Sequence, residues 1–87
     1  MKIIDLEGEV YQGTPVQIVS KMRNTFNRFN PKPVATNEEF MKAYIANMKF
    51  LKDSIACVGD TPEEKCASFV QSLLDTGQAK LMKDRER

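Results

Sequence analysis

Three segments of this chain carry the same helix-start pattern, in which Gln or Glu follows a threonine by three residues. The pairs are Thr14–Gln17, Thr36–Glu39 and Thr61–Glu64. In such a capping box, the threonine side chain accepts a hydrogen bond from the later backbone N–H, and the later side chain reaches back to the threonine N–H. Pro15 and Pro62 follow two of the threonines, at the first helical position, where a missing N–H costs nothing. The pattern predicts three helices.

Apolar residues follow each helix start at helical spacing, which predicts one buried face per helix. They are Ile18, Val19, Met22 and Phe26 in the first, Phe40, Met41, Tyr44, Ile45, Met48, Leu51 and Ile55 in the second, and Cys66, Phe69, Val70, Leu73 and Leu74 in the third. We expect the first helix to end near Arg28, before a Pro-containing segment, and the second near residue 54. The third should end before Gly77, which readily adopts the left-handed conformation.

The residues before the first helix have the composition of a β-hairpin. Residues 2–6 and 9–11 are β-prone, and Glu7-Gly8 between them is a turn signal. An isolated hairpin is barely stable in water, so its apolar face is expected to lie on the helices. Residues 78–82 fit either a short third strand or a helical extension, and residues 84–87 should fray.

These elements predict an α+β fold in which an N-terminal β-hairpin is followed by three α-helices around one small core. A chain of 87 residues has room for a single domain, which we expect to span residues 1–83. No apolar run approaches the 20 residues of a membrane-spanning helix, and acidic Asp5 and Glu7 stand where an export signal would need apolar residues. We therefore expect a cytoplasmic protein without membrane contact.

Catalytic chemistry is poorly supported by the residues of this chain. It has no histidine to act as a base near neutral pH and no Gly-rich phosphate loop. The carboxylate pairs Glu38-Glu39 and Glu63-Glu64 fall in the first turns of expected helices, where they complement the helix dipole. The sequence thus predicts a protein that is not an enzyme and needs no cofactor.

The two cysteines, Cys57 and Cys66, lack the C-x-x-C spacing of a redox motif. Without an export signal, free thiols are the favoured interpretation, and a disulfide would need oxidising conditions. A zinc site would need carboxylates to complete two thiolates, so no metal site is expected.

The order of the charges is more informative than the net charge of +1. No acidic residue lies between Glu9 and Glu38, whereas four basic residues do, with amides and the aromatic residues Tyr11, Phe26 and Phe29 among them. Such side chains can stack on nucleobases and bind phosphates. The first helix also starts with neutral Gln17 instead of a carboxylate, which leaves its positive end open to an anion.

This acid-free stretch is the favoured contact surface for an acidic partner, namely nucleic acid, a nucleotide or an acidic protein. Its candidate residues are Thr14, Gln17, Lys21, Arg23, Asn24, Asn27, Arg28 and Lys32. The competing interpretation is that the basic residues form the solvated face of an amphipathic helix.

A second candidate surface lies on the far side of the second helix, where small residues stand beside an aromatic one. Its residues are Ala43, Ala46 and Phe50. They could form a contact in a homodimer or with another protein. Alternatively, this helix is central and covered on two sides. The sequence predicts a small binding or regulatory protein with either an acidic partner or a protein partner.

The opening pattern Tyr11-x-Gly13-Thr14-Pro15-x-x-Ile18-Val19-x-x-Met22-Arg23 resembles small bacterial and phage-borne proteins. The resemblance implies no activity and no functional residue, because the pattern consists mostly of capping chemistry that unrelated helices share.

Overall fold

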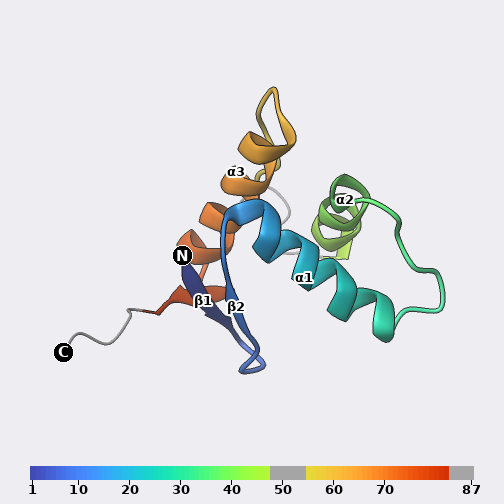
Figure 1. Ribbon diagram of the computed structural model, residues 1–87, viewed down its shortest axis with the longest axis horizontal. Coiled ribbons are helices and arrows are strands. Elements are labelled where there is room, and N and C mark those ends of the chain that lie inside the picture. Colours follow the sequence, from blue (N-terminus) through green and yellow to red (C-terminus); the bar gives the residue numbers. More distant parts are fainter. Residues whose placement is uncertain (48–54, 83–87) are drawn as a thin grey trace.

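The computed structural model describes residues 1–47 and 55–82 and has the expected α+β fold (Figure 1). Its elements in chain order are β1 (Lys2–Asp5), β2 (Val10–Gln12), α1 (Pro15–Arg28), α2 (Asn37–Asn47), α3 (Pro62–Asp75) and β3 (Ala79–Leu81). Of the two structures that residues 78–82 allowed, the strand is the one formed. The expected end of the second helix near residue 54 lies outside the described residues. Over the described part of the chain, no helix has the length and apolarity to cross a membrane.

The three strands form one antiparallel sheet in the order β2-β1-β3. Ile3 in the central strand pairs with Tyr11 on one side and with Leu81 on the other. The hairpin turn is held by the Asp5 carboxylate, which accepts hydrogen bonds of 2.9 Å from both the Glu7 and the Glu9 N–H. Gly8 in this turn has φ of 89°, a conformation that favours glycine. β3, the last strand of the chain, pairs with β1, the first, and completes the sheet.

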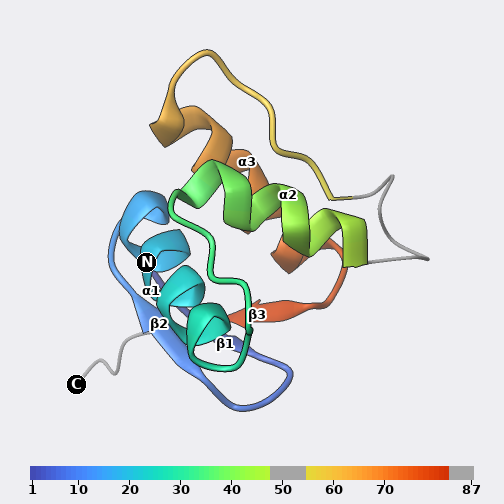
Figure 2. The ribbon, with the colours of Figure 1, turned by 90° about the vertical axis from the view of Figure 1, so that its right-hand side faces the viewer.

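The helices lie on one side of this sheet (Figure 2). α1 packs on β2, and α3 packs on β3, so both cover the inner face that carries Ile3 and Tyr11. As far as it is described, α2 packs against α1 and α3 and not against the sheet. The buried core comprises Ile3, Tyr11, Ile18, Val19, Met22, Phe40, Met41, Ile55, Cys66, Phe69, Val70, Leu73 and Ala79.

All three capping boxes form as the sequence predicts. The threonine hydroxyls accept hydrogen bonds of 3.1–3.2 Å from the backbone N–H groups of Gln17, Glu39 and Glu64. The reciprocal bonds from the threonine N–H groups to the Gln or Glu side chains measure 2.8–3.2 Å. The boxes therefore fix where each helix begins and leave the apolar faces to pack together.

The cap at the start of α3 gives a direct test of this local chemistry. Replacing Thr61 with alanine removes the acceptor for the Glu64 N–H, and we expect it to lower the free energy of unfolding by about 1 kcal/mol. Thr61→Ser keeps the hydroxyl and should lower the free energy of unfolding much less. Urea denaturation of both variants measures the difference, and equal losses would contradict a role for the hydroxyl.

Candidate functional site

Four of the sequence-predicted residues form one outward row on α1. Gln17, Lys21, Asn24 and Arg28 follow one another at spacings of four, three and four, which places them on one helix face, and all four are exposed. Lys32, in the loop that follows, is also exposed. We call Gln17, Lys21, Asn24 and Arg28 the outer row.

Two other predicted residues, Arg23 and Asn27, fasten the loop after α1 back onto the helix. The Arg23 guanidinium donates a 2.6 Å hydrogen bond to the Ala35 carbonyl. The Asn27 side chain donates to the Val34 carbonyl and accepts from the Val34 N–H, each at 2.9 Å. This pair of bonds imitates the backbone pairing of a strand. The structure therefore gives Arg23 and Asn27 a role in holding the loop.

The start of α1 is less open to an external anion than its lack of a carboxylate indicated. Pro15 has no N–H, and the Thr14 and Gln17 N–H groups are both taken up by the capping box. Lys21 lies further along and donates a 3.3 Å hydrogen bond to the Gln12 carbonyl, while its side chain remains exposed. The cationic part of the outer row therefore lies beyond the first turn.

The three aromatic residues of the acid-free stretch have different environments. Tyr11 is buried opposite Ile3 in the sheet, and Phe26 packs against the core. Phe29 is 83% exposed, the highest value among the large apolar side chains that the structure describes. It caps α1 beside Arg28, and its N–H donates to the Phe26 carbonyl at 3.2 Å. An exposed aromatic side chain between basic residues is thus left at the end of α1.

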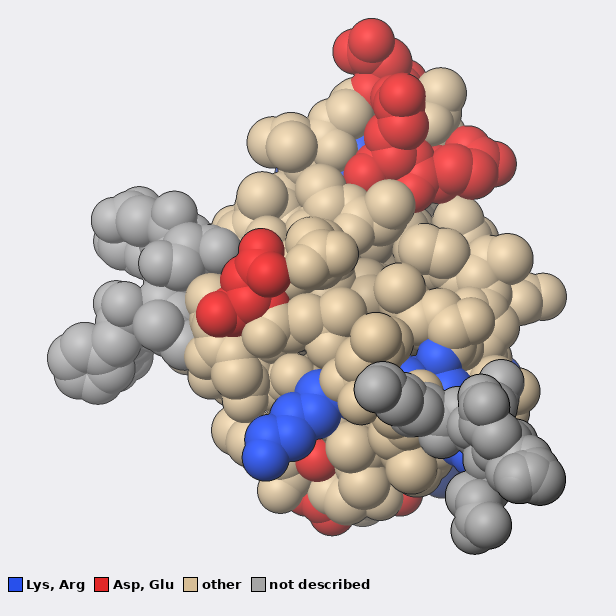
Figure 3. Space-filling view, turned by 90° about the vertical axis from the view of Figure 1, so that its left-hand side faces the viewer, with Lys and Arg blue, Asp and Glu red and all other residues tan. Residues whose placement is uncertain are grey.

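Acidic side chains gather elsewhere, at the end of the molecule where α3 begins with Glu63 and Glu64 (Figure 3). Glu38 at the start of α2 pairs with Lys65 at 3.4 Å and with Lys42 at 3.5 Å, which lowers the pKa of its carboxyl. Within the described part of the chain, these ion pairs use Lys42 and Lys65 and no basic residue of α1. The positive charges of the outer row are therefore not neutralised by an ion pair there.

The second predicted surface can be described only in part. Ala43 is half-buried and Ala46 is exposed on α2, while Phe50 lies outside the described residues. The contact in a dimer or with another protein stays a prediction.

Cys57 is partly buried and Cys66 is fully buried, and both are free thiols. Burial raises the pKa of both, so each stays protonated at neutral pH, which makes it a weak nucleophile. Among the residues that the structure describes, no three His, Cys, Asp or Glu side chains are grouped to hold a metal ion.

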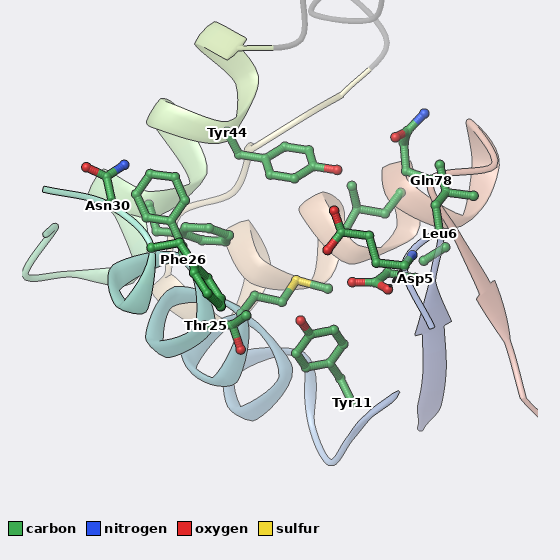
Figure 4. Close-up of a pocket in the computed structure, with 14 residues that line it drawn as sticks. Asp5, Leu6, Tyr11, Thr25, Phe26, Asn30, Tyr44 and Gln78 are labelled. Atoms are coloured by element: carbon green, nitrogen blue, oxygen red, sulfur yellow. Dashed lines mark hydrogen bonds between the residues drawn. The ribbon is translucent and has the colours of Figure 1, made fainter. Parts of the chain in front are cut away.

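A cleft of about 490 Å³, which the sequence did not indicate, lies between α2 and the sheet (Figure 4). It forms because α2 packs on the other two helices and leaves a gap above β1 and β2. Its lining combines apolar and aromatic side chains with two carboxylates and several neutral polar groups: Asp5, Leu6, Glu7, Tyr11, Met22, Thr25, Phe26, Phe29, Asn30, Phe40, Tyr44, Leu73, Gln78 and Ala79. Burial is the main cause that raises the pKa of Tyr11 and of Tyr44, and nearby Asp5 and Glu7 add to it.

No protein-family model matches this chain, and comparisons with curated proteins and with solved structures found no significant match. The functional argument therefore depends on the geometry and chemistry of the chain's own residues.

The loop-holding role of Asn27 can be separated from ligand binding by a matched pair of variants. Asn27→Ala removes two partly buried hydrogen bonds and should lower the free energy of unfolding by about 2 kcal/mol. Asn24→Ala, one turn away on the exposed face, should change it by less than about 0.5 kcal/mol. Chemical denaturation measures both, and similar values would contradict the assignment.

Proposed function

We propose that this protein is a small non-enzymatic binding protein that contacts single-stranded nucleic acid. The contact surface is the outer row of α1 together with Phe29 at the end of this helix and Lys32 in the loop that follows. The observation that carries the proposal is Phe29, an aromatic residue that is 83% exposed beside an exposed arginine. Single-stranded nucleic acids present bases that stack on aromatic rings and phosphates that attract cations. The end of α1 offers both kinds of contact.

The surroundings of Phe29 support a preformed contact surface. Asn27 and Arg23 hold residues 34 and 35 against α1, and Lys32 N–H donates a 2.8 Å hydrogen bond to the Asn30 side chain. The loop that carries Lys32 is thus held on α1 at residues 34 and 35, and its start is held by a local turn. A surface that needs little ordering loses less conformational entropy on binding.

A single strand fits this surface better than a duplex or an acidic protein. Three exposed cations, Lys21, Arg28 and Lys32, provide only a modest positive charge, whereas an exposed ring adds affinity only where a base can be unstacked. The bases of a duplex are already stacked on one another. A carboxylate-rich protein would use the cations and leave Phe29 without a stacking partner.

The test is fluorescence anisotropy of a labelled oligothymidylate at low salt. Phe29→Ala should weaken binding by about 5- to 150-fold, the range of one base–aromatic stack. The affinity should fall with salt at a logarithmic slope of about −2, as three phosphate contacts on a single strand predict. Arg28→Ala should make this slope less steep.

Matched controls make the result specific. Val58→Ala removes another exposed apolar side chain, and Lys80→Ala removes an exposed cation on β3. Neither should alter affinity appreciably. The proposal fails if the wild type does not bind at low salt, or if the controls weaken binding as much as Phe29→Ala. Salt-sensitive binding without any effect of Phe29→Ala would instead favour an acidic protein or a duplex.

The alternative, a homodimer through the back face of α2, has its own test. If Ala43, Ala46 and Phe50 form the contact, Phe50→Glu should convert a dimer into a monomer by placing a charge in an apolar interface. Sedimentation velocity of the wild type and the variant measures this, and a wild-type monomer would remove the alternative.

A further inference from the structure

We infer that the cleft between α2 and the sheet binds a small organic cation of the quaternary alkylammonium class, with its charge held between aromatic rings and the Asp5 and Glu7 carboxylates (Figure 4). This site goes beyond the proposed function, since it takes a ligand of the opposite charge in a cleft that meets the proposed nucleic-acid surface at one residue, Phe29. Its case depends on the shape, the ring arrangement and the charge of the lining.

The aromatic part of the lining is a connected wall. The Phe26 and Phe40 rings meet edge to face with centroids 5.4 Å apart, and Phe40 and Tyr44 follow at 6.0 Å. Tyr11 approaches from the sheet, and in Figure 4 the phenol groups of Tyr11 and Tyr44 both point into the cleft. Aromatic faces attract a cation through their quadrupole, and rings on several sides are the usual surroundings of bound quaternary ammonium groups.

The charged part of the lining is negative. Asp5 is fixed by the hairpin turn, because one of its oxygens accepts from both Glu7 and Glu9 N–H, so its carboxylate is preorganised at the side of the cleft. Glu7 is exposed and adds a second negative charge. Among the described residues that line the cleft there is no lysine or arginine. The lining therefore favours a cation and repels an anion.

An organic cation suits these groups better than a metal ion or a neutral apolar molecule. A hard divalent cation requires about six oxygen ligands, whereas most of this lining is apolar or aromatic. A neutral molecule would bury the aromatic wall but gain nothing from Asp5 and Glu7. An alkylammonium ion suits both the aromatic wall and the two carboxylates, because its methyl groups are apolar while its charge is diffuse and weakly hydrated.

The experiment is a titration of the full chain with choline, followed by amide chemical shifts, beside the same titration with 3,3-dimethyl-1-butanol. The second compound has the same shape without the charge. We expect choline to shift the amides of residues 5–7 and 78 and the alcohol to leave them unchanged. The paired substitution Asp5→Asn with Glu7→Gln should weaken choline binding by about 2- to 30-fold, the range for two charge contacts that remain open to solvent.

The variants are chosen to preserve the fold. Asp5→Asn keeps a side-chain oxygen that can accept from the Glu7 and Glu9 N–H groups, and Glu7→Gln alone changes an exposed side chain. Glu63→Gln removes the same charge at the start of α3, away from the cleft lining, and should leave choline binding unchanged. The inference is overturned if choline produces no shifts, if the neutral alcohol binds equally well, or if Glu63→Gln and Glu7→Gln have the same effect.

Discussion

The contact that the rest of the structure depends on is an aromatic cluster that joins the three helices. Phe69 of α3 is fully buried and meets Tyr44 edge to face at 5.3 Å and Phe40 at 6.1 Å, and Phe40 in turn meets Phe26 of α1. Each such pair contributes about 0.5–1.5 kcal/mol beyond the burial of its area. Because Phe40 and Tyr44 both belong to α2, the cluster holds that helix on α1 and α3. The cleft above the sheet is a consequence of this placement.

Most of the fold could be predicted because its signals are local. A capping box involves residues three positions apart, and the alternation of buried residues along a helix follows from its own periodicity. The helix starts at Thr14, Thr36 and Thr61 were therefore readable from the chain. The strand at Ala79–Leu81 was one of two structures expected for residues 78–82, and the sequence did not decide between them, since these residues become a strand only by pairing with β1 at the far end of the sequence.

The candidate surfaces were harder to predict from the sequence, because exposure is a property of tertiary packing. Tyr11, Phe26 and Phe29 look alike in an acid-free stretch, yet only Phe29 stays exposed. Helical spacing does not separate Phe26 from Phe29, since Phe29 follows Met22 by seven residues, a spacing that also returns to the same helix face. α1 ends at Arg28, and Phe29 stands exposed at its end. The bonds of Asn27 to Val34 had no sequence signal either, because they depend on the path of the loop. The cleft depends on side chains from all three helices and all three strands.

The two proposed surfaces carry opposite charges and meet at one residue. Phe29 belongs to the exposed end of α1 and also borders the cleft, whereas Arg28 and Lys32 are absent from the cleft lining, as far as the structure describes it. Phe29→Ala is therefore expected to affect the binding of either ligand, and each effect is assigned by titrating that ligand separately. The charged residues separate the two surfaces, because removing a positive charge from α1 and removing a negative charge from β1 change the electrostatic attraction of different ligands in opposite directions. Charge, and not the shared ring, distinguishes a nucleic-acid surface from an ammonium site on this protein.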